Sequence, residues 1–116
     1  MSPAKATMTV RHATDKASII DIEGEVTSAA ENALMDAYTQ AVSHNAHAIV
    51  LNFSRMEYMN SSGIGLLVTL LIRTQRQKQH LHVCSLSDHY RQIFELTRLN
   101  EAIGIYASEA DAVAAL

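Results

Sequence analysis

The sequence lacks several features that would place it outside the cytoplasm. Its single cysteine, Cys84, cannot form an internal disulfide, which is typical of a protein from a reducing compartment. No window holds the roughly 18 apolar residues of a membrane-spanning helix, and residues 1–7 lack the apolar core of a signal peptide. We therefore predict a cytoplasmic protein with no membrane insertion.

Neither sign of charge dominates the chain. The formal net charge is −3, and both signs are scattered along the sequence. A protein that binds nucleic acid or an anionic membrane surface usually concentrates positive charge, so we expect neither as a partner.

Motifs for metal, nucleotide and nucleophilic chemistry are also missing. Six histidines are present, but no cysteine pair accompanies them, and zinc requires three or four convergent ligands. We expect His44, His47, His80 and His82 to be surface residues and Cys84 to be a small core residue. There is no Gly-x-Ser-x-Gly elbow and no Walker-type phosphate loop. We predict no enzymatic activity, no metal and no cofactor.

What is present fits one domain. A chain of 116 residues with 48% hydrophobic residues can form a single core. No repeat, low-complexity tract or linker divides it. We predict one domain over residues 1–116, with residues 1–7 as a flexible lead-in.

Alternation and short apolar runs predict five strands. The ranges are 8–12, 17–23, 48–53, 81–85 and 103–106. Ile20 and Ile22 alternate with Asp21 and Glu23, as in a half-buried strand that Gly24 ends. The continuous apolar run 48–53 is typical of a strand covered on both faces.

Apolar residues at steps of three and four predict four helices, over residues 27–44, 61–79, 88–97 and 108–116. Ser28 with Glu31 forms a candidate capping box, and Ser108 with Asp111 opens the last helix in a similar way. In the second helix, Ile64, Leu67, Val68 and Leu71 make one stripe. We expect Leu66 and Leu70 to be core residues rather than contacts, and Leu96 to be an apolar position of the third helix.

Strands followed by strand–helix alternation indicate an α/β domain. We predict a mixed, mostly parallel sheet of about four or five strands with about four helices packed on it. In such sheets, binding sites favour the ends of strands where helices begin.

One such junction stands out, at Asn60-Ser61-Ser62-Gly63. All three polar residues are good N-cap residues, and the first turn of a helix offers unpaired N–H groups and partial positive charge. A phosphate on a serine there would be electrostatically favoured. Gly63 and Gly65 would let another protein approach closely. Ordinary cap and turn chemistry explains the same residues, so both interpretations stay open on residue types alone.

The wider stretch resembles the signature of anti-sigma factor antagonists, the STAS domain family. That pattern is an apolar strand, a few polar residues, and then Phe-Met-Asp-Ser-Ser/Thr-Gly-Leu-Gly. Here it reads Met59-Asn60-Ser61-Ser62-Gly63-Ile64-Gly65. The likeness extends through Ile22-Glu23-Gly24-Glu25-Val26 and through residues 83–87 and 93–97, so it covers nearly all of residues 8–116.

The resemblance implies a partner-switching regulator. In that family the unphosphorylated domain binds an anti-sigma factor or related switch serine kinase. The kinase uses ATP and Mg²⁺ to phosphorylate the first serine of the motif, which breaks the complex, and a separate phosphatase restores it. Carried onto this chain, the phosphoacceptor is Ser61, and Met59, Asn60, Ser62, Gly63, Ile64 and Gly65 form the partner-binding loop around it. Independently of the resemblance, the small size of the chain and its mixed surface charge predict a monomer when it is alone.

One position departs from the family pattern. Asn60 stands where the family usually has Asp immediately before the acceptor. Asn has the same shape and still caps a helix, but it removes a like charge beside the phosphate. That change could stabilise the phosphorylated form, or slow the kinase if the carboxylate helps to orient the hydroxyl. Ser62 as acceptor, and a domain that is never phosphorylated, remain alternatives.

Residues before the acceptor could be core or an apolar rim for a partner. We expect mixed roles for Met56, Tyr58 and Met59, with Met59 pointing inward. The alternative to a phosphorylation switch is a constitutive STAS subunit of a signalling or transport complex, in which Asn60 and Ser61 merely cap the helix.

Overall fold

The structure is a computed structural model that describes residues 6–43 and 45–116. Five strands form one sheet, in the order β1-β2-β3-β4-β5. Their bounds are β1 Thr7–Thr14, β2 Ala17–Val26, β3 Ala48–Met59, β4 His80–Cys84 and β5 Gly104–Tyr106. The β1–β2 pair is antiparallel and the other three pairs are parallel. The predicted α/β class and the mixed, mostly parallel sheet are therefore confirmed.

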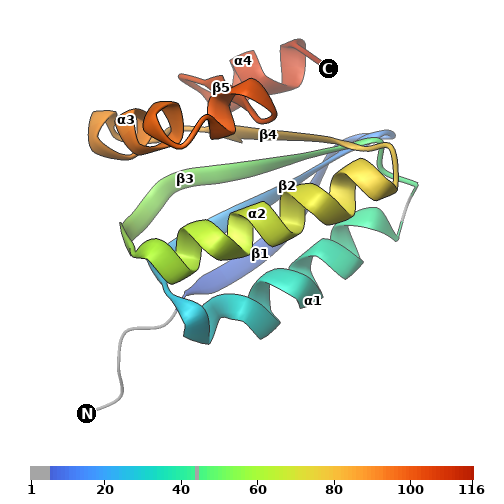
Figure 1. The fold of residues 1–116 in the computed structure, drawn as a ribbon. Helices are drawn as coiled ribbons and strands as arrows, with labels where there is room; N and C mark the ends of the chain where they lie inside the picture. Colours follow the sequence, from blue (N-terminus) through green and yellow to red (C-terminus); the bar gives the residue numbers. More distant parts are fainter. Residues whose placement is uncertain (1–5, 44) are drawn as a thin grey trace.

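Helices cover both faces of this sheet. Their bounds are α1 Glu31–Val42, α2 Ser61–Arg76, α3 Asp88–Leu96 and α4 Glu109–Ala114, with short 3-10 turns η1 Ser28–Ala30 and η2 Leu99–Glu101. Figure 1 shows α1 and α2 side by side across one face, with α4 beyond β4 on the other side. This arrangement leaves the start of α2 at one end of the sheet and its C-terminus at the other.

Two hydrophobic clusters follow from strand alternation. Ile20 and Ile22 of β2 face α1 and α2 and belong to the larger cluster, which also includes Phe94 of α3. Ile19 points to the opposite face, where it joins Val50, Cys84 and Ala112 under α4. Cys84 is fully buried, as predicted.

Strands β2 and β3 are longer than predicted. β2 continues past Gly24 to Val26, because this glycine adopts a φ of 87° and absorbs an irregularity in the register while pairing continues. β3 continues past Phe53 because β2 still lies beside it, up to the Val26–Met59 pair. Its pairing with β4 ends at Asn52, so the second half of β3 has β2 as its only paired strand among the described residues.

Three helix predictions need correction. The first turn before α1 is capped by Thr27, whose Oγ1 accepts a hydrogen bond from the Ala29 N–H, and Ser28 makes no such cap. The buried stripe of α2 runs through Leu66, Leu67, Leu70 and Leu71, so those positions face the core while Val68 is exposed. Leu66 and Leu70 are core residues, as expected. Leu96 is 84% exposed at the end of α3.

The two ends of the chain agree with expectation only in part. Ser108 caps α4 as predicted, because its Oγ accepts a hydrogen bond from the Asp111 N–H. Thr7 already belongs to β1, and Ala6 packs against the core. The predicted flexible lead-in over residues 1–7 is therefore wrong for Ala6 and Thr7. Residues 1–5 and His44 lie outside the described part.

A polar network fixes α4 to the sheet. Arg11 of β1 forms hydrogen bonds with Asp21 of β2 and with Glu109 at the first turn of α4. Asn52 Nδ2 also donates to Glu109 Oε1, at 3.1 Å. The Arg11 hydrogen bonds lower the pKa of the Glu109 carboxyl, and the two carboxylates raise the pKa of Arg11.

Candidate functional site

The candidate site lies where β3 ends and α2 begins. Asn60 is the N-cap: its backbone is extended, and its Oδ1 accepts a hydrogen bond from the Gly63 N–H at 3.0 Å. The Ile64 N–H donates to the Asn60 carbonyl at 3.0 Å, which closes the first helical turn. Asn60 thus performs the capping role that an Asp would perform, without its charge.

Ser61 and Ser62 are the first two residues of α2, and both are exposed. Their backbone N–H groups make no hydrogen bond within the described part of the chain, since the cap serves Gly63. Two free donors at the positive end of a 16-residue helix suit an anion. A phosphate on either serine would lie beside them.

The two motif glycines have different roles. A Cβ on Gly63 would lie 2.2 Å from the Val26 carbonyl oxygen and 2.8 Å from Met59 Cγ, so only glycine fits there. A Cβ on Gly65 would meet no atom of the described residues within 4 Å. Gly63 therefore allows α2 to pack closely on the end of β2, and it is not open to a partner. Gly65 is exposed, and its lack of a side chain leaves space on the outer surface of α2 near Ser61.

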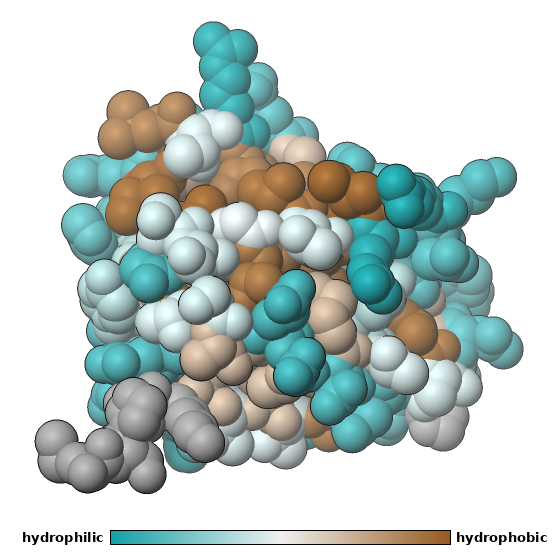
Figure 2. All heavy atoms as spheres, turned by 60° about the horizontal axis from the view of Figure 1, so that its bottom comes forward, coloured by the Kyte–Doolittle hydropathy of each residue, from teal (hydrophilic) through white to brown (hydrophobic). Residues whose placement is uncertain are grey.

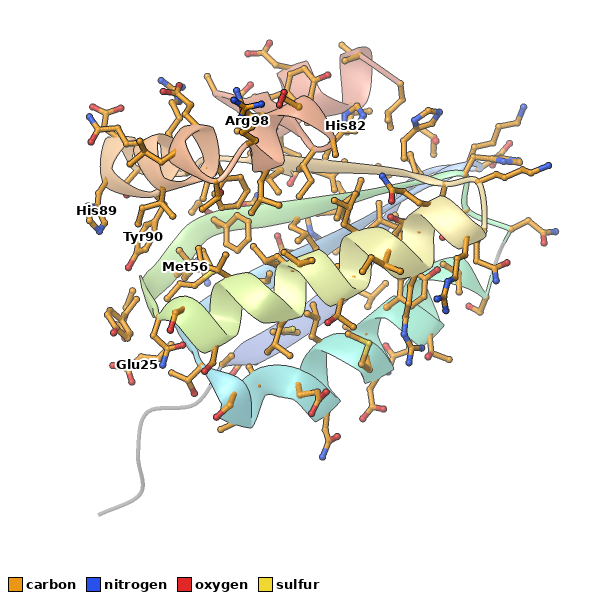
Figure 3. All side chains as sticks on the ribbon, in the orientation of Figure 1. Glu25, Met56, His82, His89, Tyr90 and Arg98 are labelled. Atoms are coloured by element: carbon orange, nitrogen blue, oxygen red, sulfur yellow. The ribbon has the colours of Figure 1, made fainter. Side chains whose placement is uncertain are left out.

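Further contacts hold the junction from outside the motif. The Val26 carbonyl also accepts the Asn60 N–H, at 3.3 Å. The Tyr90 hydroxyl of α3 accepts a hydrogen bond from the Met59 N–H at 2.9 Å, where β4 no longer pairs with β3. Figure 3 shows Tyr90 at the end of the sheet where α2 begins. Nothing in the local sequence pattern around Tyr90 indicates a contact with the distant Met59.

Residues before the acceptor divide between core and surface. Met59 is 4% exposed and points inward, as predicted, and Ile64 packs partly against the same cluster. Tyr58 is 47% exposed, and Met56 is half-buried against the core. Glu25, directly before Val26, lies at this same end of the molecule (Figure 3).

The remaining candidates do not form a site. No group of three or more metal-binding side chains occurs within residues 6–43 and 45–116. His82 differs from the predicted surface histidine: it is half-buried and stacks on Tyr106 with ring centroids 5.0 Å apart. Its Nδ1 has no hydrogen-bond partner among the residues that the structure describes. Burial lowers the pKa of His82, so the neutral form is favoured. Burial also raises the pKa of Cys84, which makes its thiol a poor nucleophile.

Several known proteins have a similar fold. The STAS domain family model matches residues 8–112. An anti-sigma factor antagonist from Mycobacterium paratuberculosis is 24% identical, with a TM-score of 0.77 over 95% of this chain and 92% of that one. The phosphorylated form of the Bacillus cell fate determinant SpoIIAA is 21% identical, with a TM-score of 0.72 over 92% of this chain and 96% of that one.

A solved structure from another functional class has the same fold. A sulfate transporter family protein from Wolinella succinogenes is 16% identical, with a TM-score of 0.73 over 84% of this chain and 82% of that one. In this chain, no helix among the described residues is both long enough and apolar enough to cross a membrane.

Proposed function

Because this chain belongs to the STAS domain family, we propose that it is an anti-sigma factor antagonist that works by partner switching. The unphosphorylated protein binds an anti-sigma factor that is also a serine kinase. Transfer of the ATP γ-phosphoryl group to the Ser61 hydroxyl, with Mg²⁺ held by the kinase, releases the partner. A phosphatase removes the phosphate and restores binding.

The exposed Ser61 at the start of α2 is the observation that carries this proposal. A phosphate there adds roughly −1.5 to −2 charges. The free N–H groups of the first turn can bind it while the helix stays in place. A partner docked over this turn would have to bury that charge, which is costly without a matching cation.

The surface around Ser61 supports docking of another protein. Gly65, Val68 and Ile72 follow Ser61 at steps of three and four along α2, and Val68 and Ile72 are 37% and 44% exposed. Figure 2 shows hydrophobic side chains along α2 on this face. Tyr58 adds an exposed aromatic ring one residue before the buried Met59. A partner could therefore cover apolar surface and the acceptor hydroxyl together.

We further propose that the chain has no catalytic activity of its own. A serine nucleophile needs a base within hydrogen-bond reach. No histidine or carboxylate forms a hydrogen bond with Ser61 or Ser62 among the described residues. Both hydroxyls suit the role of acceptors for another enzyme.

Variants of the acceptor test the proposal. Ser61→Ala should bind the switch kinase but accept no phosphate, while Ser61→Asp and Ser61→Glu should bind poorly. Ser62→Ala is the matched control for the neighbouring hydroxyl, and Ser43→Asp adds the same charge at an exposed position beyond the end of α1. Equal affinity of the wild type, Ser61→Ala and Ser61→Asp for the kinase would contradict a switch at Ser61.

A constitutive STAS subunit is the second candidate, because a sulfate transporter family protein has the same fold and Asn60 already serves as a simple cap. In that case the intact mass of the protein from its host should never include a phosphate under any growth or stress condition. Recurring phosphorylation of Ser61 would exclude this candidate.

A further inference from the structure

A second feature lies at the opposite end of α2 from Ser61, about 24 Å away along a helix of this length. A cleft of about 800 Å³, open to solvent, lies between the last turns of α1 and α2. Its lining consists of Tyr38, Val42, Asn45, Ala46, His47, Arg73, Arg76, Gln77 and Gln79. A volume of this size is typical of sites for small organic molecules.

The back of the cleft is held by side-chain hydrogen bonds. The Tyr38 hydroxyl donates to Gln79 Oε1 at 2.7 Å, and Gln79 Nε2 donates to the Ala46 carbonyl at 3.2 Å. The Gln79 backbone N–H donates to the Thr74 carbonyl at 2.8 Å. These bonds join α1, α2 and the loop before β3, so the shape of the cleft exists before any ligand arrives.

The charged side chains that line the cleft, Arg73 and Arg76, are both positive. The chain contains 12 Asp and Glu residues, yet none of them lines it. Arg11, Arg55 and Arg91 form ion pairs with acidic residues, whereas Arg73 and Arg76 form none with the described residues. Burial raises the pKa of Tyr38, and the charge of Arg73, which lines the same cleft, opposes that rise. Figure 2 shows hydrophilic side chains gathered at this end of the molecule.

A purely local role explains part of this arrangement. Cations near a helix C-terminus complement the helix dipole, and α1 and α2 both end here. Each helix end carries about half a negative charge. Two guanidinium groups therefore exceed the combined charge of both ends, and the cleft keeps a positive surplus.

We propose that this cleft binds a small organic phosphate. The planar guanidinium groups of Arg73 and Arg76 would hold the phosphate oxygens, which they match in geometry. The apolar lining from Tyr38, Val42 and Ala46 would cover the organic part of the ligand. This site is independent of Ser61 and does not require partner switching.

A titration of the whole, isotopically labelled protein tests the site. We would record amide NMR spectra with 1-naphthyl phosphate, and separately with inorganic phosphate and 1-naphthol. The phosphate ester should shift the amides around Arg73, Arg76 and Gln79 at lower concentration than either fragment does. Added salt should weaken binding of the ester.

Variants that remove one arginine charge inside or outside the cleft test which residues bind the ester. Arg73→Gln and Arg76→Gln should each weaken binding of the ester about tenfold. Arg98→Gln removes an exposed arginine from a distant turn (Figure 3) and should leave the affinity unchanged. The proposal is overturned if millimolar ester shifts no cleft amide, or if the three variants bind it equally. Capture of an acidic peptide but not of the ester would also overturn it.

Discussion

At the scale of single residues, the acceptor turn depends on atoms that leave no space for change. The Val26 carbonyl oxygen accepts the Asn60 N–H and also lies where a side chain at position 63 would begin. The Asn60 side chain then caps the helix from the other direction. The Val26–Asn60 hydrogen bond, the close contact of Val26 with Gly63 and the Asn60 cap together fix where the first turn of α2 lies relative to the end of the sheet.

Replacing Gly63 by Ala should destabilise the protein. The new Cβ would clash with backbone at 2.2 Å, and overpacking of this kind typically costs about 1–3 kcal/mol. Gly65→Ala is the matched control: with open space around it, the alanine should raise helix stability by up to about 1 kcal/mol. Urea unfolding of both variants measures the difference. An equal free energy of unfolding would contradict the packing role of Gly63.

A charge at Ser61 should affect binding and stability in opposite ways. An acidic residue in the first turn of a helix stabilises it by about 0.3–1 kcal/mol. We therefore expect Ser61→Asp to unfold at the same or a slightly higher urea concentration than the wild type, even though its partner affinity falls. A loss of stability in Ser61→Asp would instead attribute any weaker binding to damage of the fold.

At the scale of secondary-structure elements, α3 supports the site from the side that β4 leaves open. Strand β4 stops pairing at Asn52, seven residues before the end of β3. The Tyr90 hydroxyl supplies an acceptor for the Met59 N–H in its place. The orientation of α3 and the position of the acceptor turn are thus connected by one hydrogen bond.

Removal of that hydroxyl should loosen the end of β3. Tyr90→Phe leaves the Met59 N–H without its acceptor, at a cost of about 1–2 kcal/mol. Hydrogen exchange of the Met59 amide should become faster, while exchange in β1 and the first half of β2 changes much less. Unchanged protection of Met59 in Tyr90→Phe would show that the hydrogen bond does not hold this strand.

Helix α4 depends on the Arg11 network, which makes its docking sensitive to acid. The pKa of Glu109 is lowered in the folded state, chiefly by its hydrogen bonds with Arg11. Its contribution to stability is therefore complete above its usual pKa of 4.5 and is lost as pH falls below that value through the folded-state pKa. Arg11 stays charged throughout.

Acid titration of Glu109→Gln tests this linkage. Part of the fall in melting temperature below about pH 4.5 should disappear in the variant. Glu101→Gln, at an exposed position without an ion pair among the described residues, should keep the wild-type pH profile. Identical profiles for the wild type and Glu109→Gln would rule out the proposed role of this carboxylate.

At the scale of the whole molecule, periodicity was enough to predict the class of fold and the order of its elements. Ile20 and Ile22 alternate with polar residues, and the buried positions of α2 repeat at helical spacing, so local pattern and final packing agree. The lengths of strands β2 and β3 were predicted less well. The polar second half of β3 reads as loop, and only the presence of β2 beside it keeps this segment extended.

The candidate site was predictable only for the residues that are neighbours in sequence. Asn60, Ser61 and Ser62 lie where the expected helix start places them. The Val26 carbonyl and the Tyr90 hydroxyl come from β2 and α3, and their approach follows from tertiary packing. The role of Gly63 was misjudged for the same reason, because what a glycine makes room for depends on the element packed against it.

In the proposed function, phosphorylation of Ser61 controls binding of a switch kinase. The most direct test mixes the purified protein with each switch-kinase-type protein of its own genome and Mg-ATP, then follows intact mass, the modified residue and the complex. We predict a single added phosphate, located on Ser61, and dissociation of the complex as it forms. A complex that persists without phosphate, or a phosphate located elsewhere, would contradict the claim.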